Sequence, residues 1–176
     1  MRYFNLTAIA YWLIPARPVR ELLSEIIRIL AEELDAPRFE PHLTLFAVPG
    51  SDESARKLLR RIKAQRVHLA VRDVGFSANF AKTLFVRFES NEALKDLTEQ
   101  LQQAEKSRAP PLSNPHVSLI YKQLSPRAKS ELASAIKFPF HGIVFDCIKA
   151  IRCPTPTRTR ADVESWKVVA RRSLHQ

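Results

Sequence analysis

The sequence has few of the residues that define several classes of protein. Among 176 residues, only three are glycine and two are cysteine. Two cysteines are too few for a disulfide scaffold, which favours a reducing, cytoplasmic setting. Cys147 and Cys153 fall in one predicted strand, so they would lie roughly 20 Å apart at about 3.3 Å per residue. We therefore expect no disulfide between them.

Long apolar stretches are also lacking. No run of about 18 apolar residues occurs, so the sequence predicts neither a transmembrane helix nor a membrane partner. The apolar stretch that follows Arg2 resembles a short signal peptide. However, Asn5 and Thr7 interrupt it, and no small-residue cleavage site follows at a suitable distance. We expect this stretch to form the first strand.

Acidic residues are the minority among the charged side chains. There are 28 Lys and Arg residues against 18 Asp and Glu residues, which gives a formal net charge of +10. This balance favours anionic partners such as nucleotides, RNA or phosphate esters. The sequence has no long basic tract and no aromatic ladder, and their absence argues against a long RNA footprint.

Hydrophobic periodicity predicts alternating strands and helices. The predicted strands cover residues 3–15, 41–48, 67–77, 83–89, 116–121, 138–153 and 165–174, the predicted helices cover 18–35, 52–65, 91–107 and 126–137, and 154–162 is a predicted polar loop. The order strand, helix, strand, helix, strand therefore occurs twice, and one strand follows. We predict an α+β protein with a single domain over residues 1–176. Its two duplicated αβ units, built from about 3–77 and 83–174, form two antiparallel sheets around a central cleft, with helices on the outer faces.

Two similar hexapeptides mark the candidate site. The sequence PHLTLF at 41–46 recurs 74 residues later as PHVSLI at 115–120. Because side chains alternate along a strand, His42 and Thr44 share one face, as do His116 and Ser118. Burial alone does not require a histidine and a hydroxyl on one strand face. The repeat therefore indicates two halves of one site.

The chemistry of these four side chains suits a phosphodiester. An imidazole has an ordinary pKa near 6.5, so one histidine can take a proton while the other gives one. The hydroxyls of Thr44 and Ser118 can hydrogen-bond non-bridging phosphate oxygens while water attacks in line. The spacing of His, Cys and carboxylate residues does not match a zinc site. We expect neither a metal nor another cofactor.

The paired H-x-[ST]-x motifs at His42 and His116 resemble those of the 2H phosphoesterases, and the chain is most similar to the plant-type cyclic phosphodiesterases. The resemblance covers nearly the whole chain and includes residues 12–15, 37–42, 115–121 and 164–170. It implies a bilobed, LigT-like fold. It also implies metal-independent hydrolysis of ADP-ribose 1″,2″-cyclic phosphate and of nucleoside 2′,3′-cyclic phosphates to 2′-phosphates. In the implied mechanism, His116 is the base that activates water and His42 is the acid that protonates the leaving oxygen.

The resemblance adds a further phosphate contact, and two alternative functions stay open. Tyr121 matches a tyrosine that contacts the phosphate in similar enzymes, but strand parity places it opposite His116 unless the strand twists or ends there. Trp12 is a candidate for stacking on a nucleobase. One alternative function is an enzyme acting on RNA ends, as a 2′,3′-cyclic phosphodiesterase or a 2′–5′ RNA ligase-like enzyme. The other is a non-catalytic nucleotide-binding module, which the complete pairs of histidine and hydroxyl argue against. We expect a monomer.

Overall fold

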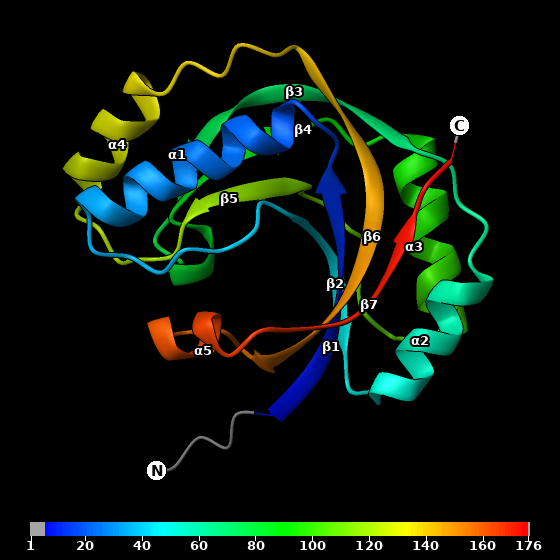
Figure 1. Ribbon diagram of the computed structural model, residues 1–176. Helices are drawn as coiled ribbons and strands as arrows, with labels where there is room; N and C mark the ends of the chain where they lie inside the picture. Colours follow the sequence, from blue (N-terminus) through cyan, green and yellow to red (C-terminus); the bar gives the residue numbers. More distant parts are fainter. Residues whose placement is uncertain (1–5, 176) are drawn as a thin grey trace.

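The computed structural model describes residues 6–175 (Figure 1). The strands are β1 (Leu6–Pro15), β2 (Leu43–Val48), β3 (Val67–Phe76), β4 (Leu84–Phe88), β5 (His116–Ile120), β6 (Gly142–Thr155) and β7 (Lys167–Ser173). The helices are α1 (Val19–Glu33), α2 (Asp52–Arg61), the 3₁₀ helix η1 (Phe80–Lys82), α3 (Glu92–Ala104), α4 (Pro126–Ala135) and α5 (Arg160–Glu164). None of these helices is long and apolar enough to cross a bilayer. The predicted start of the first strand, residues 3–5, lies outside the described residues.

All eleven predicted elements occur in the predicted order, and one additional α-helix occurs where a loop was predicted. The prediction of a loop over residues 154–162 was wrong because α5 begins inside it. A capping box starts this helix: the Thr159 side chain accepts a hydrogen bond from the Asp162 amide, and the Asp162 carboxylate accepts one from the Thr159 amide. This pattern of Thr and Asp three residues apart is a sequence signal for a helix start.

The strands form one continuous sheet, and this corrects the prediction of two separate sheets. The sheet is antiparallel, with the order β1-β2-β5-β4-β3-β6-β7, and it curls so that β1 also pairs with β6. The long strand β6 makes the connection. Its first residues, 142–145, pair with β3, and residues 147–152 pair with β7, while β1 lies along the opposite edge. The α+β class is confirmed.

Strands from the two predicted units are interleaved in space. β3 belongs to the range 3–77 but pairs with β4 and β6, and β6 belongs to the range 83–174 but pairs with β1. The helices also pack across the two units, because α1 contacts β5 and α4 contacts β3. α1 and α4 lie on one side of the curled sheet, and α2 and α3 lie on the other (Figure 1). Each side of the molecule therefore combines segments that are far apart in the sequence.

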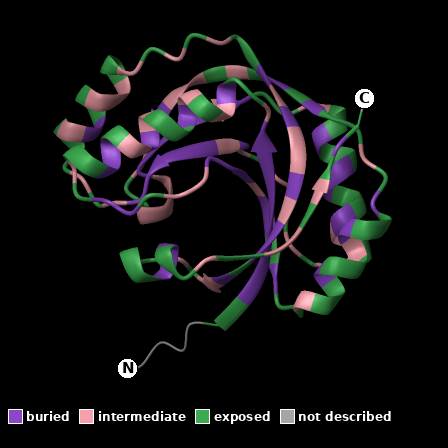
Figure 2. Cartoon of the chain, in the orientation of Figure 1, coloured by how far each residue is buried: buried purple, intermediate pink, exposed green. Residues whose placement is uncertain are grey.

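Amphipathic helices close the core over the sheet. The buried residues of α1 recur every three or four positions, which places them on one helical face. Most of β1 is buried as well, from Ala8 to Ile14, because one of its faces packs in the main core and the other in a smaller cluster with Ile151 and Cys153. Figure 2 shows this arrangement, with buried residues along the strands and on the inner faces of the helices. Phe145 is fully buried where β6 pairs with both β1 and β3.

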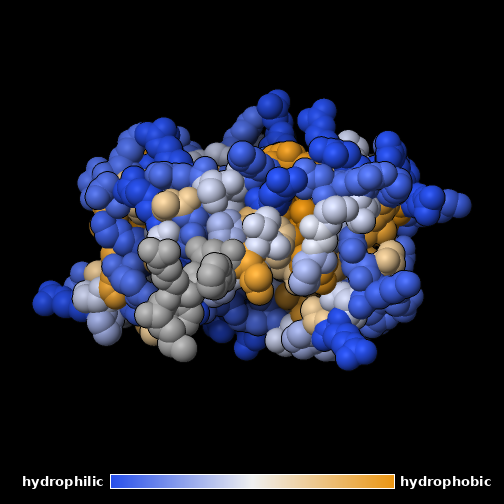
Figure 3. Space-filling view, turned by 90° about the horizontal axis from the view of Figure 1, so that it is seen from below, coloured by the Kyte–Doolittle hydropathy of each residue, from blue (hydrophilic) through white to orange (hydrophobic). Residues whose placement is uncertain are grey.

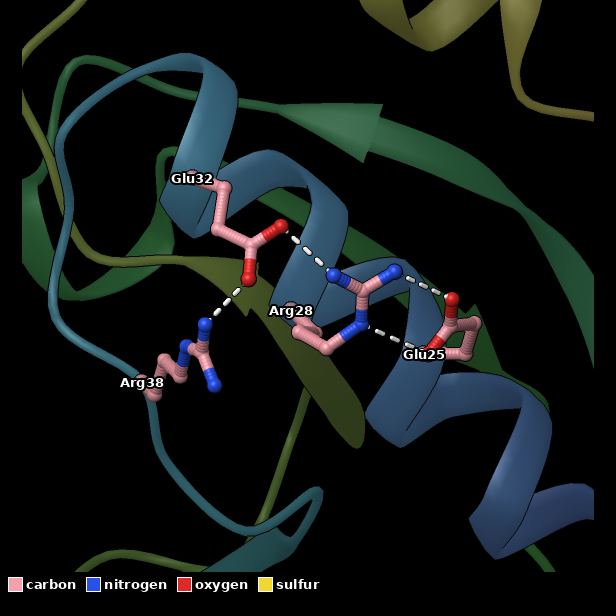
Figure 4. Close-up of polar contacts among 4 residues, drawn as sticks. All are labelled: Glu25, Arg28, Glu32 and Arg38. Atoms are coloured by element: carbon pink, nitrogen blue, oxygen red, sulfur yellow. Dashed lines mark hydrogen bonds and ion pairs between the residues drawn. The ribbon is translucent and has the colours of Figure 1, made fainter.

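A chain of ion pairs connects the exposed face of α1 to the segment that precedes β2 (Figure 4). Arg28 contacts Glu25 and Glu32 on the helix, and Glu32 also contacts Arg38. Exposed ion pairs of this kind contribute about 0–1 kcal/mol each. The pair of Glu32 with Arg38 connects α1 to the segment that leads to His42.

Candidate active site

The pairing of β2 with β5 brings the two motifs together. Leu43 is the register partner of Val117, and each of these residues directly follows a motif histidine. Each histidine was predicted to share a strand face with the hydroxyl two residues later, and the two pairs were predicted to form one site. His42, Thr44 and His116 do line one cavity of about 350 Å³. The other lining residues come from β1, η1, β6 and the segments around them: Ala10, Trp12, Ala47, Asn79, Ala81, Lys82, Tyr121, Cys153, Pro154, Thr155, Thr157 and Trp166.

His42 is held in one tautomer inside a largely apolar environment. Its Nδ1 lies 2.7 Å from the Glu40 carbonyl oxygen, which can only accept, so Nδ1 carries the proton and Nε2 is left as an acceptor. The side chain is 4% exposed. Burial is the main cause that lowers the pKa of His42, the Glu40 hydrogen bond raises it, and the nearby His116 lowers it, so that the net pKa is about 3. In the free protein, His42 is therefore neutral at pH 7.

His116 has the same backbone arrangement at a more accessible position. Its Nδ1 lies 2.8 Å from the Asn114 carbonyl oxygen, two residues earlier, as in the first motif. Burial lowers its pKa, the hydrogen bond to Asn114 raises it, and the positive charge of Lys82 lowers it. Both histidines thus use Nδ1 for orientation and leave Nε2 available for proton transfer.

The two motif hydroxyls have different environments. Thr44 is half-buried and lines the cavity. Ser118 is 3% exposed, is not among the lining residues, and donates a hydrogen bond of 2.9 Å to the Ala81 carbonyl. In the free protein, Ser118 therefore positions the backbone of a residue that lines the cavity.

Tyr121 reaches the site because its strand ends just before it. β5 ends at Ile120, so strand parity no longer applies at Tyr121. The tyrosine oxygen lies 3.4 Å from His42 Nε2, which is long for a hydrogen bond. Burial raises the pKa of Tyr121, so the hydroxyl keeps its proton and can donate to this nitrogen.

The indole of Trp12 stacks on the imidazole of His42 and is not free on both faces for a nucleobase. Its ring centroid is 3.5 Å from that of His42, with 10° between the ring planes. The indole is 5% exposed, and Trp166 meets it edge-on at 5.0 Å. One face of Trp12 is therefore occupied by His42, which limits the predicted stacking on a nucleobase to the remaining surface of the indole.

Sequence reasoning missed several residues around His42. Phe39 and Trp166 complete an aromatic enclosure, with ring centroids 6.0 Å and 5.6 Å from the imidazole. The Trp166 Nε1 hydrogen is buried and has no partner among the described residues. The Lys149 ammonium lies 2.7 Å from each Glu40 carboxylate oxygen and so restrains the residue whose carbonyl orients His42. No local pattern could reveal this ion pair, because its members lie 109 residues apart.

Metal ligation and thiol chemistry find little support in the structure. Within residues 6–175, no three side chains of His, Cys, Asp or Glu are grouped as metal ligands. Cys147 and Cys153 are both free thiols, and Cys153 lines the cavity. Burial raises the pKa of Cys153 to about 11, so this thiol is protonated at neutral pH and is a poor nucleophile.

Comparisons with known proteins identify the class and then the family. The chain aligns with the crystal structure of apo LigT from E. coli over 98% of its length and 100% of that chain, with a TM-score of 0.58 and 18% identity. It aligns with TT0787 of Thermus thermophilus over 95% of its length and 97% of that chain, with a TM-score of 0.57 and 16% identity. These likenesses show the LigT-like fold. The match of residues 7–174 to a family of cyclic phosphodiesterases makes the chain a 2H phosphoesterase.

The family model described as cyclic phosphodiesterase-like protein matches residues 7–174. The chain belongs to this family and is an enzyme of the phosphodiesterase class. A curated relative, the cyclic phosphodiesterase of Arabidopsis thaliana, is 22% identical over 165 residues, which is 90% of this chain and 91% of the relative. Crystal structures of E. coli LigT exist in complex with 3′-AMP, ATP and NADP+.

The depressed pKa of His42 makes stability depend on pH. The unfolded chain binds a proton at this histidine below about pH 6.5, whereas the native protein does not until about pH 3. Unfolding therefore takes up a proton in this window. We expect His42 to lower the free energy of unfolding by up to about 1.4 kcal/mol per pH unit as the pH falls below 6.5, and His116, whose pKa is also lowered, to add to this slope. Urea titrations at intervals from pH 7 to pH 4.5 measure this slope.

The matched variant is His42→Gln, which removes the titrating group and keeps a polar side chain. Its slope over the same range is expected to be shallower than that of the wild type. Equal slopes in the two proteins would contradict a neutral, buried His42. The lower limit of pH 4.5 avoids most of the titration of Asp52, Asp73 and Asp162, whose pKa values lie below the ordinary range.

Proposed function

We propose that the protein hydrolyses ADP-ribose 1″,2″-cyclic phosphate and nucleoside 2′,3′-cyclic phosphates, the latter to 2′-phosphates, by acid–base catalysis with His42 and His116. The observation that carries this proposal is the matched orientation of the two imidazoles. Each is held through Nδ1 by a carbonyl two residues earlier, and both line one cavity. The family relatives support a small cyclic phosphate as substrate. The proposal includes a cytoplasmic, monomeric enzyme that needs no metal.

The reaction requires two proton transfers around one phosphorus atom. One imidazole takes a proton from the attacking water through Nε2, and the other gives a proton to the ribose oxygen as its bond to phosphorus breaks. Lys82 and the Thr44 hydroxyl line the cavity and can stabilise the negative charge on the non-bridging oxygens. Tyr121, beside His42 Nε2, can donate to the same phosphate.

The implied assignment of His42 as the acid has an electrostatic requirement. Burial disfavours a charged His42 in the free protein, so an imidazolium at this position needs a compensating negative charge. The bound phosphate supplies that charge. If His42 is the acid, substrate binding is therefore accompanied by protonation of His42.

The lowered pKa values of the two histidines predict that kcat/KM is highest at acidic pH. The step needs one neutral and one protonated imidazole, and burial lowers both pKa values in the free protein below 6.5. We expect kcat/KM to follow a bell-shaped pH profile with its maximum below pH 6.5, since kcat/KM reports the free enzyme. Above this range, kcat/KM falls as the last imidazolium loses its proton. The kcat profile, which reports the complex, is expected to lie at higher pH because the bound phosphate favours the imidazolium.

Initial rates with 2′,3′-cyclic AMP from pH 3 to pH 9 test this expectation. A kcat/KM maximum above pH 7.5 would show that the two histidines are not the titrating pair.

Phosphorus NMR of 2′,3′-cyclic AMP mixed with the protein tests the function itself. We expect the cyclic phosphate signal to be replaced by that of 2′-AMP, and we expect added EDTA to leave the rate unchanged. The double variant His42→Ala/His116→Ala is the control for contaminating activity. An unchanged cyclic phosphate signal, or equal turnover by the double variant, would overturn the proposal.

A further inference from the structure

A large share of the positive charge gathers around the C-terminal half of α2, away from the catalytic cavity. Three surface hollows of about 810 Å³, 570 Å³ and 280 Å³ adjoin this helix, α3 and β7, and they share lining residues. The cations that line them are Arg56, Lys57, Arg60, Arg61, Lys63, Arg66, Arg171 and Arg172. We refer to these eight residues and the three hollows as the α2–β7 surface.

Few acidic groups neutralise this charge. Arg56 and Lys57 pair with Asp52 and Glu53 on their own helix. Within residues 6–175, the other six cations of the surface make no ion pair with an acidic side chain. The acidic residues that line the hollows are Asp96 and Glu105, and Glu105 already accepts a hydrogen bond from the Tyr11 hydroxyl.

The catalytic cavity does not account for this charge. Among its lining residues, the only side chain with a permanent positive charge is Lys82, and none of its lining residues belongs to the α2–β7 surface. A mononucleotide bound between the two histidines would therefore leave the eight cations unused. Their number and spread fit an anion with many charges, because a groove of one sign raises the local concentration of counter-charge.

We propose that the α2–β7 surface binds the phosphate backbone of single-stranded RNA. No Phe, Tyr or Trp is among the described residues that line the three hollows, and His175 supplies their one ring, so base stacking contributes little and contacts with phosphates dominate. The amides of Gln65, Gln100 and Gln103 line the hollows and can hydrogen-bond phosphate or ribose oxygens. The choice of RNA over DNA rests on the proposed function, because a 2′,3′-cyclic phosphate forms only where a 2′-hydroxyl is present.

The surface is less suited to an anionic membrane. Binding in the membrane interface needs apolar side chains beside the cations. None of the large, exposed apolar side chains found in residues 6–175, namely Leu6, Ile29, Phe76 and Val168, lines the hollows. The face shown in Figure 3 is also mainly hydrophilic, with apolar residues scattered between hydrophilic ones.

Fluorescence anisotropy with a labelled 20-nucleotide oligouridylate tests the proposal. We expect binding at 50 mM KCl that weakens steeply as salt increases. The triple variant Arg60→Gln/Arg61→Gln/Lys63→Gln should bind the RNA roughly tenfold or more weakly at this salt concentration. The slope of its log affinity against log salt should be shallower by about 2, because each lost phosphate contact accounts for about 0.7. Turnover of 2′,3′-cyclic AMP should not change, because the three side chains lie outside the catalytic cavity.

A matched variant controls for net charge. Arg17→Gln/Arg127→Gln/Lys137→Gln removes the same charge from exposed positions outside the three hollows and should change RNA affinity less than threefold. Equal weakening by the two triple variants, or no binding of the wild type at 50 mM KCl, would overturn the proposal. Vesicles of 70% phosphatidylcholine and 30% phosphatidylserine would also overturn it if they bind more tightly than the RNA and if that binding depends on Arg60, Arg61 and Lys63. Because binding is measured without turnover, inactivity toward cyclic nucleotides would not affect this result.

Discussion

Replacing His116 with alanine is expected to lower kcat for 2′,3′-cyclic AMP by about 10²- to 10⁴-fold, the range for loss of one general acid or base. His42→Ala is expected to fall within the same range. Each imidazole is oriented by its own carbonyl, and no third histidine lines the cavity to replace the one that is removed. The double variant should be little slower than the slower single variant, because groups that act in one step are not additive. Single-turnover rates measured with phosphorus NMR or chromatography give these values.

The same variants decide which histidine takes the proton from water. The variant that lacks the general acid loses the alkaline limb of the pH–kcat profile, whereas the variant that lacks the base loses the acid limb. If the assignment implied by the resemblance is right, His42→Ala loses the alkaline limb and His116→Ala loses the acid limb. Thermal unfolding of each variant separates a catalytic loss from a folding defect. A decrease in kcat below tenfold in both single variants would contradict the paired mechanism.

Phe145→Ala is expected to reduce the free energy of unfolding by about 3–5 kcal/mol, the range for a buried Phe replaced by Ala. Phe145 is fully buried, packs edge-on against Phe88 with ring centroids 5.7 Å apart, and lies opposite both Pro15 and Val67 in the sheet register. Its side chain thus supports the point where β6 joins the two parts of the sheet. Urea denaturation at pH 7 measures the loss.

Val168→Ala provides the comparison for this prediction. Val168 also lies in the sheet, on β7, but is 58% exposed, so its truncation should change the free energy of unfolding by less than about 0.5 kcal/mol. Similar losses in the two variants would contradict the burial of Phe145 where β6 pairs with β1 and β3. A large loss confined to Phe145→Ala would support the burial of Phe145 in the core between β6 and its neighbours.

Local patterns in the sequence predicted the strands and helices well because each pattern depends on near neighbours. The three- and four-residue spacing of apolar side chains predicted α1, and alternation predicted β2 and β5. The loop assigned to residues 154–162 was wrong because the signal for α5 lies in its cap, Thr159 and Asp162, and not in an apolar repeat. The prediction that Tyr121 needs the end of its strand to reach the phosphate agrees with the end of β5 at Ile120.

The sequence by itself determined the chemical groups of the site, because two strands that each carry a histidine and a hydroxyl repeat at equivalent positions. Only the tertiary structure decided the environment of those groups. The stacking of Trp12 on His42, the ion pair of Lys149 with Glu40, and the single sheet joined through β6 all depend on contacts between distant segments. The α2–β7 surface has the same origin, since folding brings cations from α2 and β7 together without any basic tract in the sequence. Local periodicity reflects the geometry of one element, whereas burial, pKa and surface charge depend on which elements pack against each other.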